Sequence, residues 1–210
     1  PLERGFGLTI GNAFRRTLLA AIQGAAVIAV KIEGVRHELS IIPGVIEDVT
    51  DILLNIKQIV FKYDKDEPCW ITLESDQEGV VTAGMLNLPA GVEIVNPDLP
   101  ICTLAEGGSI KAELFLDYGR GYVDREEHEI SDESIGVMRL DANYSPLTKV
   151  AYRVEDTRVG QRTDYDRLVL EIETDGSVAP VDSLAFSAKI LKDHMQLFIN
   201  FDEEPIDMPE

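Results

Sequence analysis

The segment from Ile10 to Ile22 places the strongest constraint on how this chain can fold. Its apolar residues recur at the spacing of one helix face, and they are Ile10, Ala13, Phe14, Leu18, Ala21 and Ile22, with Thr17 among them. Helical geometry places on the opposite face Asn12, Arg15, Arg16 and Leu19. Arginines beside an apolar anchor are typical of protein interfaces. An ordinary surface leucine between solvated arginines fits the same spacing.

A second helical pattern runs from Pro180 to Ile199. Its apolar residues cover nearly half of the helix circumference, and they are Leu184, Phe186, Ala188, Ile190, Leu191, Met195, Leu197 and Phe198. This stripe is wider than the ~100° that one core contact requires. The width favours a helix that also packs on a second copy of the chain. A helix sunk deep in its own core is the alternative.

Between these two helices the pattern is mainly that of strands. We expect one further helix over 45–60, because apolar residues recur there at helical spacing and acidic residues gather near its start. Alternation and turn residues predict strands elsewhere. The expected extended segments are 25–33, 35–42, 62–64, 69–74, 80–85, 92–95, 101–104, 109–119 and 137–146. An antiparallel pair, 148–159 and 167–174, is expected to be joined by a polar turn over 160–166.

Charge and cysteine content exclude several classes of function. A net charge of -19 repels phosphate backbones, so we expect no direct contact with nucleic acid. Cys69 and Cys102 lack a CxxC neighbour, which favours two buried thiols over a disulfide. No apolar window approaches the roughly 20 residues of a membrane span. We therefore expect a soluble, cytoplasmic protein, trimmed at both ends because it begins without Met.

No arrangement of catalytic residues can be argued from the sequence. The three histidines are scattered, so no metal site and no cofactor are expected. Acidic pairs lie in polar turns, and the acidic run 124–134 is expected to be a solvated loop. No GxSxG, HExxH or phosphate-loop motif occurs, although glycines and a tyrosine form the short motif Gly119–Tyr122. A carboxylate-rich, metal-dependent hydrolase is the alternative that the acid excess suggests.

Several stretches, in order, closely resemble the amino-terminal domain of the bacterial RNA polymerase alpha subunit. They are LERGFGLTIGNAFRRTLLAAI, VRHELSIIPGVIEDVTDILLNIK, GRGY and TDYDRLVLEIETDGSVAP. The resemblance implies an α+β chain of two domains. A discontinuous α/β dimerisation domain, residues 1–23 and 148–201, is interrupted by a β-rich insertion, residues 24–147. Residues 202–210 would begin a linker.

The resemblance also implies a function and its contact residues. Members of the family dimerise and then recruit the beta and beta-prime subunits, as a non-catalytic scaffold of a nucleotidyltransferase. Carried over by position, the beta contacts are Arg15, Arg16 and Leu19. The beta-prime contacts are Lys57, Leu140 and Asp141, and the dimer contacts are Phe6, Thr17, Leu197 and Phe198. A generic homodimeric adaptor that shares only ancestry with the family is the other alternative.

Two departures from the family limit what the resemblance implies. The strand and loop that precede the ERGFG element in the family are missing here, so one strand of the dimerisation sheet is expected to be absent. The family's carboxy-terminal domain, which binds promoter DNA and activators, is also missing. No residue that contacts DNA can therefore be assigned.

Overall fold

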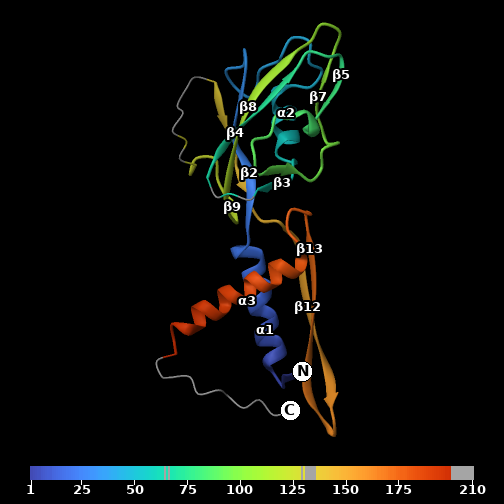
Figure 1. Cartoon of the computed structure of the whole chain (residues 1–210), viewed down its shortest axis with the longest axis vertical. Coiled ribbons are helices and arrows are strands. Elements are labelled where there is room, and N and C mark those ends of the chain that lie inside the picture. The colour runs from blue at the N-terminus through green and yellow to red at the C-terminus, as the bar shows by residue number, and fades with distance from the viewer. Residues whose placement is uncertain (64, 66, 129, 131–135, 200–210) are drawn as a thin grey trace.

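The structure is a computed structural model that describes residues 1–63, 65, 67–128, 130 and 136–199. The predicted linker, 202–210, lies outside the described residues, as does part of the predicted acidic loop. Figure 1 shows an elongated molecule with helices α1 and α3 and a long hairpin at one end and a β-rich part at the other. The presence of both helices and antiparallel sheets agrees with the predicted α+β class.

The helical end is built from five elements that come from two distant parts of the sequence. Strands β12 and β13 form a long antiparallel hairpin, and β1 pairs with the outer edge of β13. Helix α1 lies against both long strands, and α3 contacts α1 and β13. The bounds are β1 Leu2–Glu3, α1 Phe6–Ala21, β12 Leu147–Val159, β13 Arg162–Thr174 and α3 Pro180–Gln196.

The β-rich end contains a curled antiparallel sheet with strand order β4-β8-β2-β3-β6, in which β10 also pairs with β2. Two smaller sheets, β5-β7 and β9-β11, complete this end. The bounds are β2 Gln23–Ile32, β3 Phe61–Tyr63, β4 Cys69–Ser75, β5 Gly79–Thr82, β6 Val92–Ile94, β7 Pro100–Leu104, β8 Ile110–Arg120, β9 Tyr122–Val123, β10 Val137–Arg139 and β11 Ala142–Asn143.

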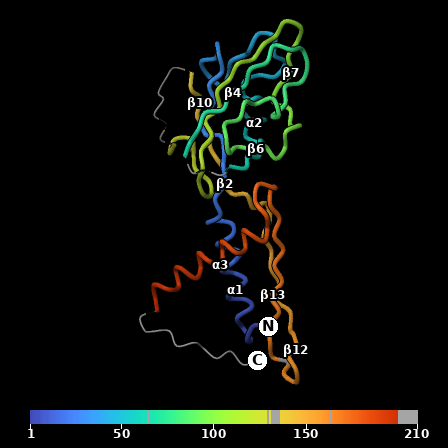
Figure 2. Tube along the Cα trace, in the orientation of Figure 1, coloured from blue at the N-terminus to red at the C-terminus, as the bar shows by residue number. Residues whose placement is uncertain are grey.

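The main core lies between this sheet and helix α2, Val49–Ile56. Strand β8 shows the predicted alternation, because Ile110, Ala112, Leu114 and Leu116 are all buried. A separate small cluster holds the helical end together, and it consists of Leu18, Ile22, Leu147 and Val150. The chain crosses between the two ends next to Gly24, where a Cβ atom would lie 2.1 Å from the carbonyl oxygen of Tyr144. The trace in Figure 2 shows this narrow connection.

The predicted helix over 45–60 is wrong at both ends. Helix α2 begins only after Asp48, whose carboxylate accepts a 2.8 Å hydrogen bond from the amide of Asp51 and caps the helix. Val45 instead forms a β-bridge with Leu104. Its helical spacing reflects burial in the same core, and not membership of the helix.

Other local expectations are corrected as well. Residues 35–42 form turns and not a strand, with a hydrogen bond from the Ser40 amide to the His37 carbonyl. Residues 83–85 form a short 3-10 helix, and 137–146 divide into β10 and β11. The hairpin turn is shorter than predicted, because β13 already begins at Arg162 and Gly160 takes a φ of 62°. Helix α3 ends at Gln196, before the predicted Ile199.

The predicted acidic loop is not wholly solvated in the part that the structure describes. His128 and Ile130 are buried, and Ile130 packs in a cluster with Ile28 and Tyr144. The edge of the His128 ring meets the Tyr144 ring, and burial lowers the pKa of His128. This segment therefore covers the outer face of the sheet.

Candidate partner-binding surfaces

The N-terminal half of helix α1 packs on the hairpin through glycines. Gly7 and Gly11 are buried, and a Cβ atom on Gly11 would lie 2.5 Å from the ring of Tyr152. The amides of Gly5 and Gly7 donate to one carboxylate oxygen of Asp166 at 2.9 and 3.0 Å. Asp166 is buried on β13 and so caps the helix from a distant strand. These contacts fix which side of α1 faces outward.

The predicted beta contacts lie on or near that outward side. Arg15 and Arg16 are exposed, and within the described ranges neither has an ion-pair partner. Leu19 departs from the predicted outward face of the helix. It is half-buried and packs against the small cluster at the helical end. The helical end thus offers two guanidinium groups to a partner, with Leu19 supplying the exposed part of its side chain.

The predicted dimer contacts include large apolar side chains open to solvent. Phe6 is 52% exposed, and Leu197 and Phe198 are each 81% exposed, whereas Thr17 is half-buried. Helix α3 begins beside the hairpin and crosses α1, and its C-terminal half projects past α1, away from the hairpin (Figure 1). The predicted wide stripe is therefore only partly buried within this chain. The buried residues of α3 are Ser183 and Ser187.

The exposed apolar surface of the helical end is larger than the predicted contacts. Leu8 and Val181, which the sequence reasoning did not single out, are also exposed, and so is Phe186. In the sequence, Leu8 and Val181 stand out only as apolar residues at helical positions that the periodic pattern does not place in a core. Large apolar side chains exposed in such number on two neighbouring helices are typical of an interaction surface.

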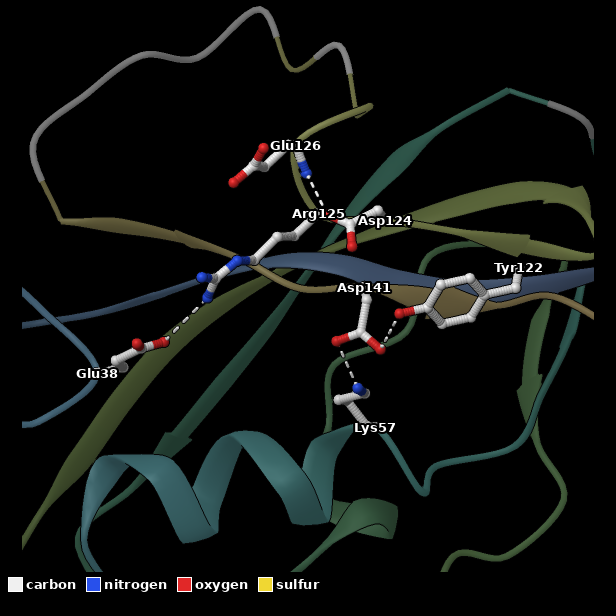
Figure 3. Close-up of polar contacts among 7 residues, drawn as sticks. All are labelled: Glu38, Lys57, Tyr122, Asp124, Arg125, Glu126 and Asp141. Carbon is white, nitrogen blue, oxygen red and sulfur yellow. Dashed lines mark hydrogen bonds and ion pairs between the residues drawn. The ribbon is translucent and has the colours of Figure 1, made fainter.

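Two of the predicted beta-prime contacts meet in one cluster. The Nζ atom of Lys57, the residue that ends α2, lies 2.7 Å from Oδ1 of Asp141, and the Tyr122 hydroxyl donates to Oδ2 at 3.2 Å (Figure 3). The hydrogen bond from Lys57 lowers the pKa of Asp141, and the Tyr122 hydrogen bond acts in the same direction. Tyr122 belongs to the glycine motif, whose tyrosine the sequence reasoning left without a role.

Leu140, the other predicted beta-prime contact, is only 7% exposed and packs in the main core. Its amide donates a 2.8 Å hydrogen bond to the carbonyl of Ile28 on β2. Burial of Leu140 thereby presents the next residue, Asp141, at the surface beside Lys57. The structure leaves the Leu140 side chain little area for a direct contact.

Reactive and metal-binding groups are sparse in the part of the chain that the structure describes. It contains no group of three or more His, Cys, Asp or Glu that could hold a metal ion. Neither cysteine is paired. Burial, and to a smaller extent the negative charge of Glu47, raises the pKa of the Cys102 thiol to about 12. Cys69 is half-buried. None of the described helices is both long and apolar enough to span a membrane.

Comparison with known proteins identifies the family of the chain. The family model described as "RNA polymerase Rpb3/RpoA insert domain" matches residues 30–145. The chain is 53% identical over 203 residues to the DNA-directed RNA polymerase subunit alpha of Nitratidesulfovibrio vulgaris strain DP4, covering 97% of this chain and 58% of the relative. It is 52% identical over 207 residues to the same subunit of Moorella thermoacetica, covering 99% of this chain and 66% of the relative.

The chain thus spans about 58% of the length of the first of these relatives. The subunit alpha of Lawsonia intracellularis gives a similar result, with 52% identity over 203 residues. Because the family model covers more than half of the chain, this chain belongs to the RNA polymerase Rpb3/RpoA insert-domain family, and its relatives are bacterial RNA polymerase alpha subunits.

Proposed function

We propose that this chain is a non-catalytic assembly scaffold of DNA-directed RNA polymerase. In this proposal two copies dimerise through the helical end and then recruit the beta and beta-prime subunits in the cytoplasm. The observation that carries the proposal is the similarity, across nearly the whole chain, to proteins named as subunit alpha of this polymerase. Nucleotidyl transfer would then take place on other subunits, with no cofactor held by this chain and no nucleic acid contacted by it.

The exposed apolar side chains of α1 and α3 support the dimer. Phe6, Leu197 and Phe198 are large and open to solvent, and Thr17 on α1 is half-buried. Covering such side chains releases about 1.5 to 3 kcal/mol each when burial is complete. A second copy would offer the same surface, and a twofold interface of this kind is self-complementary.

The exposed arginines of α1 support the beta contact. Arg15 and Arg16 each carry a planar guanidinium that can bind a carboxylate through two hydrogen bonds. Because these exposed arginines are not among the proposed dimer contacts, dimerisation and beta binding need not compete. Loss of one partner of a buried, hydrogen-bonded charge pair costs about 2 to 5 kcal/mol, which would be a large share of the binding free energy.

The cluster of Lys57 and Asp141 supports the beta-prime contact. Lys57 uses one ammonium proton for Asp141, which leaves two donors for a partner. In this proposal Leu140 acts by holding Asp141 in place from the core, and its side chain adds little direct contact area. The two large subunits would then bind opposite ends of one elongated molecule.

Co-purification of the subunits tests the proposal. The chain, with or without Arg16→Ala, is co-expressed with tagged beta, and the matched control is Arg153→Ala, an exposed arginine of the hairpin. We expect Arg16→Ala to leave the dimer intact in gel filtration and to reduce the yield of beta, whereas the control behaves as the parent chain. Retention of beta at the parent yield by Arg16→Ala would contradict the assigned contact.

The same experiment separates the generic adaptor from the scaffold. An adaptor that shares only ancestry with the family would dimerise and retain no beta even without substitution. The hydrolase alternative has no support from the relatives compared above, which carry the name of a polymerase subunit.

A further inference from the structure

Three arginines from separate segments line one cavity at the β-rich end. Arg36 follows β2, Arg125 lies between β9 and β10, and Arg139 ends β10. The cavity has a volume of about 440 Å³. Its remaining lining residues are His37, Glu38, Glu126, Val137 and Met138. In a chain of net charge -19, this concentration of guanidinium groups is a local exception.

Most of the hydrogen-bonding capacity of these arginines is unused. Arg125 forms a long ion pair with Glu38, at 3.7 Å, and its guanidinium reaches across toward that residue in Figure 3. Within the described part of the chain, Arg36 and Arg139 have no ion-pair partner. Each guanidinium carries five N–H donors and cannot lose its charge at neutral pH. Arg36 and Arg139 therefore line the cavity without an ion pair of their own, and the lining holds three arginines against two glutamates.

The floor of the cavity is apolar. Met138 is buried and Val137 is half-buried. The three arginines are exposed, so an anion that binds them would sit at the surface against this apolar floor and form charge-assisted hydrogen bonds with the guanidinium groups. The arrangement is therefore suited to a compact anionic group.

The surroundings of the cavity indicate which anion fits. Leu39 and Ile41, which follow the lining residues His37 and Glu38 along the chain, are 81% and 78% exposed. Apolar side chains beside arginine are typical of protein interfaces. A nucleic acid would extend beyond the cavity across a strongly acidic protein, which would repel its further phosphates. A single carboxylate with apolar neighbours meets only the repulsion of Glu38 and Glu126, which the three arginines of the lining outnumber.

We propose that the cavity of Arg36, Arg125 and Arg139 binds an aspartate or glutamate side chain of a protein segment that also carries apolar residues. The incoming carboxylate bridges Arg36 and Arg139, while Arg125 stays with Glu38. The apolar residues of the same segment cover Leu39 and Ile41. This surface shares no residue with α1, α3 or the neighbouring cluster of Lys57, Tyr122 and Asp141, so it adds a contact to those in the proposed assembly.

Fluorescence anisotropy with a labelled synthetic peptide, Ser-Glu-Leu-Asp-Leu-Glu-Ser, tests the proposal on the 210-residue chain. We expect Arg36→Gln and Arg139→Gln each to weaken peptide binding about two- to five-fold, the range for exposed ion pairs. Arg153→Gln, on the hairpin, is the matched control and should leave binding unchanged. Circular dichroism checks that each variant remains folded. Raising the salt concentration should weaken binding to the parent chain.

Charge reversal gives the stricter comparison. The double variant Arg36→Glu/Arg139→Glu should lose the acidic peptide and gain affinity for its lysine counterpart, Ser-Lys-Leu-Lys-Leu-Lys-Ser. Equal binding of the acidic peptide to the parent and to this variant would overturn the proposal. Tighter binding of a single-stranded oligonucleotide than of the acidic peptide would also overturn it. Because the assay contains neither beta nor beta-prime, its failure is distinct from failure of the proposed scaffold function.

Discussion

Replacement of Asp166 by alanine should loosen helix α1 from the hairpin. The Asp166 carboxylate is buried, and one of its oxygens accepts from both Gly5 and Gly7. Alanine would leave both amides without this acceptor. An unsatisfied donor that is fully buried lowers the free energy of unfolding by about 1 to 3 kcal/mol. Loss of an N-cap acceptor alone costs about 0.5 to 2 kcal/mol. Since Gly5 can reach water, we expect a total loss of about 2 to 4 kcal/mol.

A graded series separates the hydrogen bonds from the charge. An asparagine oxygen can occupy the same position and keep both bonds, so Asp166→Asn should lose only the interaction of the charge with the helix dipole, about 0.3 to 1 kcal/mol. Asp164→Ala is the matched control, because Asp164 lies on the same strand and pairs with Arg162 only at the surface. That substitution should change stability by less than about 0.5 kcal/mol.

Hydrogen exchange measured by mass spectrometry locates the effect, and urea unfolding gives its size. In Asp166→Ala the first turns of α1 should exchange faster, while the amides of β8, in the other part of the molecule, should keep their protection. If Asp166→Ala is no less stable than Asp164→Ala, or if its loss of protection is spread evenly over both ends, the assignment of Asp166 as the cap of α1 is wrong.

Three further predictions concern the β-rich end. Tyr144→Phe should cost about 1 kcal/mol in urea unfolding, because it removes the 2.8 Å hydrogen bond from the Tyr144 hydroxyl to Asp117. The Asp141 carboxylate should titrate below its ordinary pKa of 3.8 in an NMR experiment, so its pair with Lys57 is complete above that pH and is lost as the pH falls through the lowered pKa. Lys57→Ala should move this pKa upward. Cys102 should resist a thiol reagent at pH 8 in the folded chain and react once urea unfolds it, because burial raises its pKa to about 12.

Periodicity predicted the elements whose burial is one-sided and regular. Helices α1 and α3, the long hairpin and the alternation of β8 are all confirmed, although several of their ends differ. The extension of α2 to Val45 failed because residues of a loop and of a helix can pack in one core at the same spacing. The cap at Asp48 could have been found, since Asp51 follows it by three residues and acidic residues begin helices.

The exposure of the candidate contact residues on α1 was predictable where it depends on helical geometry alone. The helical spacing of the apolar residues predicts that Arg15 and Arg16 are exposed, and the structure agrees. The half-burial of Leu19 does not follow, because Leu147 and Val150, from a strand far along the chain, reach the same side of the helix. Contacts of this kind depend on tertiary pairing, which one sequence does not encode in any local pattern. The cavity of Arg36, Arg125 and Arg139 was missed for the same reason.

Small residues explain why so much apolar surface remains outside at the helical end. A helix that packs through glycine or serine approaches its neighbour closely, and its larger side chains must then point elsewhere. Helix α1 approaches the hairpin through Gly7 and Gly11, and α3 buries only Ser183 and Ser187. The stripe of α3 therefore extends beyond its packing face: Leu184, Ala188 and Leu191 are half-buried, whereas Phe186, Met195, Leu197 and Phe198 are exposed. Only a second contact can cover the exposed part, which is why the width of the pattern, more than its period, predicted self-association.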